Sequence, residues 1–245
     1  MSKPSLLDAA EAALLKVSRE KKPVSSIGTK NESSLHRSLK FRYGAETETL
    51  VGDYVCDART DEGELIEVQT GSLGPLKEKV KDLCKKNKVR IIHPIINESY
   101  IEVYQKDGTL KYRRKSPRKG STWDLFDALI YAPLLPVIKK LTIELAIVNI
   151  TEKRINDGKG SWRRKGVRIA DRTLNSWRES VILTKTKDYC QFLPFKKNEQ
   201  FTVQALAQAA GIKVSLARKV IYVCTKIKLI EKTGMKGRAP VYVRL

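Results

Sequence analysis

The spacing of apolar residues along the first part of the chain predicts two helices. Apolar side chains recur every three or four positions over residues 5–20, which is typical of an amphipathic helix. Residues 21–30 form a connector. A second helix is predicted from Asn31 to about Tyr43, where Leu35 and Leu39 lie on one stripe.

A β-hairpin is predicted next, because polar and apolar residues alternate over residues 53–59. A turn at residues 60–63 leads to a return strand at residues 65–70. Residues 75–86 then predict a helix, and the apolar run at residues 89–96 predicts a buried strand. The order helix, hairpin, helix, strand indicates an α/β fold.

Shorter signals continue this pattern through the middle of the chain. A hairpin is predicted over residues 100–112, with its turn at Asp107 and Gly108. A helix is predicted over residues 123–131 and a strand over residues 141–150.

The residues from 181 onward predict a separate unit. Thr202 is expected to cap a helix that ends at Gly211, and Ser215 to cap a longer helix that reaches about Lys228. A β-hairpin over residues 229–245 completes the pattern. Helix, turn, helix and hairpin in this order resemble a winged helix-turn-helix, which is a DNA-binding unit.

Composition excludes several classes of protein. The chain has 245 residues, 41% of them apolar, and no apolar run approaches the ~20 residues of a membrane-spanning helix. The four cysteines lack CxxC spacing and only two histidines accompany them, so we expect neither a zinc site nor a disulfide framework. We therefore expect a cytoplasmic protein with no membrane partner.

Charge is distributed unevenly along the chain. The net charge is +21, and residues 111–245 alone hold 30 basic and 10 acidic residues. Such an asymmetry indicates a polyanionic partner, and nucleic acid is the commonest one for a soluble chain. An anionic membrane surface fits less well, because the basic residues lie mainly in loops rich in Gly, Ser and Pro.

The predicted hairpin carries the candidate chemistry of the chain. Asp57 and Glu67 flank its turn on adjacent strands, and facing carboxylates repel unless a cation lies between them. Two carboxylates and a main-chain carbonyl suit Mg²⁺, which prefers oxygen ligands. Glu32, on the preceding helix, could add a third carboxylate. Asp53 lies on the same strand face as Asp57 and is the alternative aspartate.

These residues resemble a known nuclease pattern. Glu32, then Asp57, then Glu67-Val68-Gln69, in the order helix, strand, strand, resemble the PD-(D/E)xK nuclease superfamily over roughly residues 30–100. Members are mostly Mg²⁺-dependent DNA endonucleases, including restriction enzymes and Holliday-junction resolvases. The resemblance implies that Asp57 and Glu67 are metal ligands and that Glu32 is the helix carboxylate, with Mg²⁺ or Mn²⁺ as cofactor.

The chain departs from that pattern where the superfamily usually has a lysine, because Gln69 stands there. Some nucleases of the superfamily carry glutamine at this place. An amide can orient a water molecule but cannot accept its proton as a base. Lys77 or Lys79, on the next predicted helix, could supply the missing positive charge. We interpret His36 as a surface or packing histidine that could instead contact a phosphate or orient Glu32, and His93 as a core histidine.

Two basic segments, residues 111–121 and 159–172, and the predicted winged helix are the candidate nucleic-acid contacts. Each phosphate contact adds roughly one unit to the salt dependence of binding, and a tryptophan among cations permits base stacking. The predicted contact residues are Arg113, Arg114, Lys115, Arg118, Lys119, Trp162, Arg163, Arg164, Lys165, Arg218, Lys219, Tyr222, Lys236 and Arg238.

The sequence thus predicts three parts: an N-terminal helix and connector (1–30), a restriction-endonuclease-like α/β core with a mixed sheet and basic loops (31–180), and a winged-helix domain (181–245). The predicted activity is metal-dependent hydrolysis of phosphodiester bonds in duplex or branched DNA. A homodimer is expected, because two cuts need two sites. The alternatives are a non-catalytic DNA-binding regulator with this fold, which Gln69 favours, and an RNA-directed nuclease or binding protein.

Overall fold

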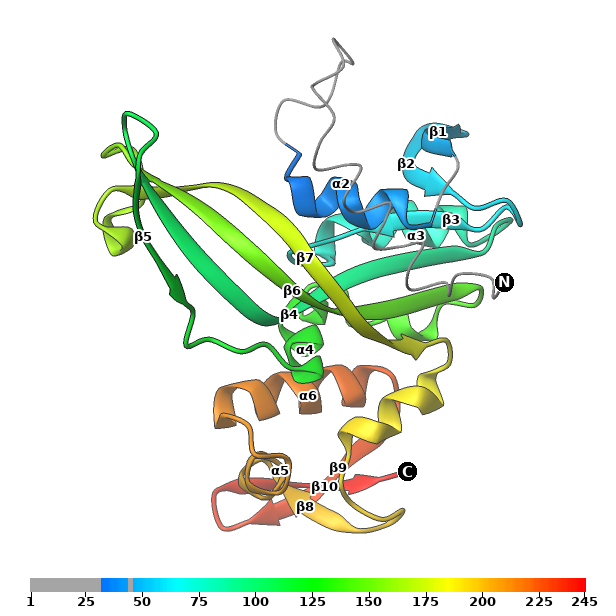
Figure 1. Cartoon of the computed structure of the whole chain (residues 1–245). Coiled ribbons are helices and arrows are strands. Elements are labelled where there is room, and N and C mark those ends of the chain that lie inside the picture. Colours follow the sequence, from blue (N-terminus) through cyan, green and yellow to red (C-terminus); the bar gives the residue numbers. More distant parts are fainter. Residues whose placement is uncertain (1–31, 44–45) are drawn as a thin grey trace, which may run out of the picture.

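The structure is a computed structural model that describes residues 32–43 and 46–245. The helix predicted over residues 5–20 and its connector lie outside the described residues. A mixed sheet of seven strands forms the body of the protein, and a small antiparallel sheet with helices forms its C-terminal part (Figure 1). The α/β fold with a mixed sheet expected from the sequence is therefore confirmed.

Six strands of the large sheet follow one another in the order β1-β2-β3-β4-β6-β7, and β5 pairs with β4. Their bounds are Glu46–Val51 (β1), Tyr54–Arg59 (β2), Leu65–Val68 (β3), Val89–Gln105 (β4), Leu110–Lys115 (β5), Leu141–Asn156 (β6) and Val167–Leu183 (β7). Strands β3, β4 and β6 are mutually parallel, whereas β1, β2 and β7 run antiparallel to their neighbours. Because parallel neighbours need a crossover connection, helical segments join β3 to β4 and β5 to β6.

Helices cover the two faces of the sheet. Helix α2 (Ser34–Phe41) lies against β3 and β7, and its Leu35 and Leu39 enter an apolar cluster with Ile66 and Val148. The crossover segments are η2 (Gly74–Leu76), α3 (Lys77–Leu83), η3 (Thr122–Asp124), α4 (Leu125–Leu129) and η4 (Leu135–Val137). They pack into a second apolar cluster. The β3 strand has all four residues buried, as a strand covered on both faces requires.

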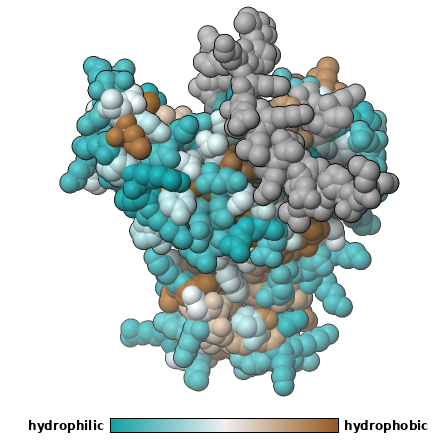
Figure 2. Space-filling model, viewed as in Figure 1, coloured by the Kyte–Doolittle hydropathy of each residue, from teal (hydrophilic) through white to brown (hydrophobic). Residues whose placement is uncertain are grey.

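The far halves of β4, β6 and β7, together with β5, form an arm that projects away from the helices (Figure 1). The sequence predicted a short strand and a separate hairpin where β4 is one continuous strand of 17 residues. It also missed β7. Only two of the 17 residues of β7 are buried, so its sequence lacks the apolar pattern of a core strand. On the face visible in Figure 2, hydrophilic side chains cover most of the arm.

The C-terminal part follows the predicted order of helices and hairpin. It consists of η6 (Thr186–Phe192), β8 (Gln200–Thr202), α5 (Val203–Ala210), α6 (Val214–Lys226), β9 (Ile230–Lys236) and β10 (Ala239–Arg244). Thr202 caps α5 by accepting a hydrogen bond from the Ala205 backbone N–H, and Gly211 ends that helix in the left-handed conformation, as predicted. The predicted cap at Ser215 is wrong. Lys213 holds the extended N-cap conformation, so Ser215 already lies in the first turn of α6.

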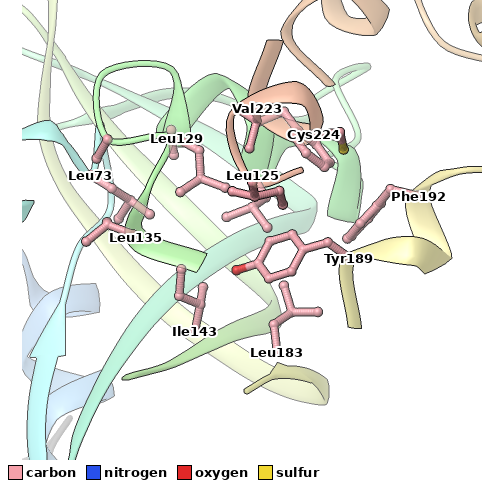
Figure 3. Close-up of a cluster of buried hydrophobic side chains, with 14 of the residues drawn as sticks. Leu73, Leu125, Leu129, Leu135, Ile143, Leu183, Tyr189, Phe192, Val223 and Cys224 are labelled. Atoms are coloured by element: carbon pink, nitrogen blue, oxygen red, sulfur yellow. The ribbon is translucent and has the colours of Figure 1, made fainter. Parts of the chain in front are cut away.

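The apolar core is continuous between the large sheet and the C-terminal part. Figure 3 shows Tyr189 and Phe192 of η6 and Val223 of α6 gathered with Leu125 and Leu129 of α4. These side chains belong to one buried cluster, so the two parts are packed together rather than strung on a linker. None of the helices in the described residues is long and apolar enough to cross a membrane.

Candidate nuclease site

The candidate site begins at the start of α2, where His36 and Lys40 share one side of the helix at four-residue spacing. Glu32 was predicted to lie on this helix, but it precedes the N-cap Ser33 and reaches back to the same side. Glu32 Oε1 lies 2.5 Å from His36 Nδ1 and 2.9 Å from Lys40 Nζ. Burial opposes ionisation of Glu32, but the hydrogen bonds from Lys40 and His36 outweigh it and lower the pKa of this carboxyl. Glu32 is therefore an ionised carboxylate held in place by two donors.

The N-terminal end of α2 is fixed to the large sheet. The Ser33 side chain caps the helix, and the backbone N–H and hydroxyl of Ser34 donate to the Asp171 carboxylate of β7 at 2.9 Å and 2.6 Å. Because a charged acceptor strengthens such hydrogen bonds, this anchor determines where Glu32 and His36 meet the neighbouring strands.

The Asp57 carboxylate on β2 points toward α2. Its Oδ2 accepts a hydrogen bond from the Val68 backbone N–H at 2.8 Å, and its Oδ1 lies 3.8 Å from Lys40 Nζ. His36 Nε2 donates to the Val68 carbonyl at 2.9 Å and lies 3.5 Å from Asp57 Oδ2. The ring nitrogen of His36 thus occupies the point on which a carboxylate oxygen and a carbonyl oxygen converge. This contact with the strands makes His36 more than the surface or packing histidine that we favoured from the sequence.

Glu67 on β3 lies just beyond the paired stretch of the hairpin. The β2–β3 register joins Ala58 to Ile66 and Arg59 to Leu65, and Asp57 and Glu67 are the next residues along each strand. Only 3% of Glu67 is exposed. Its carboxylate takes a different partner from that of Asp57, because Glu67 Oε1 lies 2.5 Å from Lys79 Nζ of α3.

Lys79 bridges two strands from the helix that follows them. Besides Glu67, its Nζ donates to the Val55 carbonyl of β2 at 2.6 Å. Burial is the largest influence on Glu67 and raises the pKa of its carboxyl, the nearby Asp57 charge raises it further, and Lys79 partly offsets both. Of the two lysines weighed from the sequence, the structure brings Lys79 to the carboxylates. Lys77 instead pairs with Glu78 at 3.3 Å.

Gln69 is held by its own loop. Its side-chain Nε2 donates to the Ser72 carbonyl at 2.6 Å, and its backbone carbonyl accepts from His93 Nδ1 at 2.6 Å. His93 is buried, as expected for a core histidine, and burial lowers the pKa of its imidazole. Gln69 stands where the resembled nucleases usually carry a lysine, and here its hydrogen bonds fix the chain directly after β3.

The carboxylate and carbonyl oxygen atoms at this site are of the kind that binds magnesium, but in this structure their partners are Lys40, Lys79 and His36. Among residues 32–43 and 46–245, no three His, Cys, Asp or Glu side chains are grouped so as to hold a metal ion. Asp57 and the Val68 carbonyl converge on one point next to His36, whereas the Glu67 carboxylate, on the adjacent strand, is paired with Lys79 of α3. Hard oxygen donors of this kind fit Mg²⁺ or Mn²⁺.

The two predicted basic segments lie on the arm. Arg113, Arg114 and Lys115 are exposed on β5, and Arg118 and Lys119 follow in the next loop. The other segment forms the β6–β7 turn, where η5 (Trp162–Arg164) leaves Trp162 83% exposed. The Arg163 guanidinium lies 5.5 Å from the Trp162 ring, and Lys165 ends the turn in the left-handed conformation. An exposed aromatic ring among cations is suited to stacking on a base.

Both basic segments reach one pocket of about 500 Å³. Arg118 comes from one segment and Arg164 from the other, and the pocket extends to residues 70–72, directly after Gln69. Arg154 and Arg172 also line it. Arg172 is the last residue of the second predicted segment but was not singled out as a contact, and Arg154 was not predicted. The place of Arg172 in the pocket follows from its cross-strand pairing with Glu152 of β6. This pairing could not be expected from the sequence, because β7 was not predicted.

The residues predicted for the winged helix are only partly brought together. Arg218 and Tyr222 of α6 line a groove with Arg238 of the terminal hairpin. Lys219 points the other way and pairs with Asp127 of α4 at 2.6 Å. Lys236 is exposed at the end of β9. One side of α6 is thus taken up by the large sheet's helices, and the groove uses the opposite side.

Comparison with known proteins gives a family and one relative. The family described as "Domain of unknown function (DUF8091)" matches residues 33–184. An "Uncharacterized protein" of Treponema pallidum (strain Nichols) is 30% identical over 227 residues, which cover 89% of this chain and 87% of the relative. No solved structure matches.

Proposed function

The chain belongs to the DUF8091 family, and for this member we propose the activity of a divalent-metal-dependent nuclease that hydrolyses phosphodiester bonds in DNA. The observation that carries the proposal is the position of Asp57 and Glu67 on adjacent strands, one step beyond the last paired residues of their hairpin. Glu32 and helix α2 precede them, and α3 and β4 follow. This order of elements supports the resemblance to the PD-(D/E)xK superfamily.

Lys79 supports the proposal at the place where the sequence departs from the superfamily pattern. The lysine expected at Gln69 is replaced by one that reaches Glu67 from α3. A cation held next to the buried Glu67 carboxylate can stabilise negative charge that develops on a nearby phosphate. The charge is therefore retained although its position in the sequence differs.

In this proposal Asp57, Glu67 and the Val68 carbonyl hold the metal ion. When bound there, a divalent cation polarises the phosphate and lowers the pKa of a water molecule. Glu32 holds His36 through Nδ1, so that Nε2 is presented to Asp57 and Val68. His36 would act as a positioning residue that keeps the Asp57 and Val68 oxygen atoms in place. The basic arm binds the phosphate backbone by charge and carries no sequence readout.

The test compares cleavage by the full chain and its variants. Plasmid, four-way-junction and single-stranded DNA are incubated with Mg²⁺ or Mn²⁺, and we expect cleavage by the native chain. Asp57→Asn and Glu67→Gln should each reduce the rate by about 10³-fold or more, since each removes a charged group from the reacting centre. Asp61→Asn, in the exposed turn of the same hairpin, is the matched control and should cleave normally. Undiminished cleavage by both site variants would refute the site.

A second function is favoured by the present partners of the carboxylates. Lys40, Lys79 and His36 already neutralise the acidic side chains, as a site that no longer binds metal would require. The chain would then be a non-catalytic nucleic-acid-binding protein. Calorimetry with Mn²⁺ distinguishes the two, because only the nuclease binds the metal at Asp57. Competition between duplex DNA, four-way junctions and RNA identifies the preferred nucleic acid, and sedimentation tests the expected homodimer.

A further inference from the structure

The pocket between the arm and the loop after β3 has features of a built binding site. Its volume of about 500 Å³ lies in the range of small-molecule sites. Three long strands supply its apolar surface through isoleucines, such as Ile101 of β4, Ile150 of β6 and Ile169 of β7. Such a surface can cover the flat face of a ring system.

Guanidinium groups gather on one part of the pocket. Glu152 lies between Arg154 and Arg172, with Oε1 2.7 Å from Arg154 Nε and Oε2 2.9 Å from Arg172 Nε. This buried carboxylate fixes two of the four arginines. Arg118 and Arg164 are different, because among the described residues neither forms a salt bridge with a carboxylate. Arg164 donates through Nε to the Val167 carbonyl at 3.2 Å. Two guanidinium groups without a carboxylate partner, from separate loops that line one pocket, suit an anion with several oxygens.

Hydrogen-bond acceptors line another part of the pocket. His93 is 6% exposed, and its Nδ1 faces the Gln69 carbonyl. Nδ1 therefore carries the hydrogen, and Nε2 presents a lone pair. The Asp124 carboxylate adds a second acceptor, because the hydrogen bond that it accepts from the Ser121 N–H is long, at 3.4 Å. The ligand must accordingly offer N–H donors as well as an anionic group and an apolar face.

We propose that this pocket binds a single nucleotide, with its phosphate at Arg118 and Arg164 and its base on the isoleucine surface, where His93 and Asp124 receive its N–H groups. A nucleotide combines all three features, whereas inorganic phosphate lacks two of them. The pocket adjoins Gln69 through residues 70–72. The nucleotide can be the end of a DNA strand, and in that case the inference rests on the proposed nuclease function. A free nucleotide would supply the same chemistry.

Calorimetric titration of the full chain with deoxyadenosine monophosphate tests the proposal without metal and without cleavage. We expect binding that Arg118→Ala and Arg164→Ala each weaken by about tenfold or more, since each removes a charge-assisted hydrogen bond. Arg178→Ala is the matched control, because Arg178 is an exposed arginine of β7 that neither lines the pocket nor belongs to the predicted nucleic-acid contacts. It should change the affinity less than twofold. Arg164→Lys keeps the charge, loses the forked geometry, and should bind with intermediate affinity.

Several results would overturn the inference. No saturable binding at millimolar nucleotide would do so, as would an equal loss in Arg178→Ala, which would indicate nonspecific attraction. Inorganic phosphate that binds as tightly as the nucleotide would reduce the pocket to an anion site. Displacement of bound nucleotide by a duplex with an unpaired terminal nucleotide, but not by a blunt duplex, would support a strand end as the source. Displacement by free nucleotides alone would support a soluble ligand.

The nucleotide titration and the cleavage test can fail independently. Asp57→Asn should lose cleavage and keep nucleotide binding, because Asp57 does not line the pocket. Cleavage without nucleotide binding would sink only the inference, and nucleotide binding without cleavage would sink only the proposed nuclease.

Discussion

Removal of the Lys79 ammonium group should destabilise the protein in a way that depends on pH. Lys79→Met keeps most of the aliphatic stem but leaves Glu67, which is 3% exposed, without its cation. Breaking a buried ion pair by removing one partner costs about 3 kcal/mol, because an uncompensated charge stays buried. We therefore expect the free energy of unfolding of Lys79→Met to fall by about that amount at pH 8.

The pH dependence of this loss follows from the direction of the Glu67 shift. Burial and Asp57 raise the pKa of Glu67 in the folded protein above its unfolded value. The folded state then binds the proton more tightly, so the stability that protonation gives is complete below the unfolded pKa and is lost as pH rises through the folded pKa. Without Lys79 the folded pKa rises further. The difference between Lys79→Met and the native chain should therefore be smaller at pH 5 than at pH 8.

Urea denaturation followed by circular dichroism at both pH values measures this difference. Lys81→Met, an exposed lysine on the same helix, is the matched control and should change stability by less than about 0.5 kcal/mol. The double variant Glu67→Gln with Lys79→Met should recover part of the loss, because it removes the buried charge. An equal loss at pH 5 and pH 8, with no recovery in the double variant, would refute the ion pair as the cause.

Three further predictions test other parts of the fold. Thr202→Ala should lower the free energy of unfolding by about 1 kcal/mol, because α5 loses its side-chain cap; urea denaturation measures it, and an unchanged midpoint would contradict the cap. Glu152→Gln should cost about 2 kcal/mol at pH 7. Although burial opposes ionisation, hydrogen bonds from Arg172 and Arg154 lower the folded pKa of Glu152, so this stability is lost as pH falls through the folded value, and the difference from the native chain should narrow below about pH 4. A thiol reagent at pH 8 should modify the half-buried Cys190 first, and rapid modification of four thiols without denaturant would contradict the packing. The slow thiols are buried, and burial raises their pKa to about 12 (Cys56), about 11 (Cys84) and about 12 (Cys224).

Local sequence signals were sufficient for several elements of the fold. The stripe of Leu35 and Leu39 places α2, and the alternation around Asp57 gives the hairpin with its carboxylates on adjacent strands. Thr202 and Gly211 give the ends of α5. These predictions are confirmed because helix stripes, caps and hairpin turns are decided by residues within a few positions of one another.

The partners of the site residues needed the tertiary structure. Lys79 reaches Glu67 only because α3 folds back over the strands, and His36 reaches the Val68 carbonyl across 32 positions of sequence. Lys219 looked like a nucleic-acid contact from its place on the helix, yet it pairs with Asp127, 92 positions away. Spacing along a helix says which side a residue lies on but not what covers that side.

From the sequence alone we could predict the fold class, the concentration of positive charge, and the two carboxylates on adjacent strands. The length of β7, the pairing of Glu152 with Arg172 across it, and the meeting of two basic segments in one pocket emerged from the three-dimensional fold. This difference arises from the range of the interactions involved. Burial patterns and turns leave a local record in the sequence, whereas strand register and the meeting of distant loops depend on how the whole sheet is assembled.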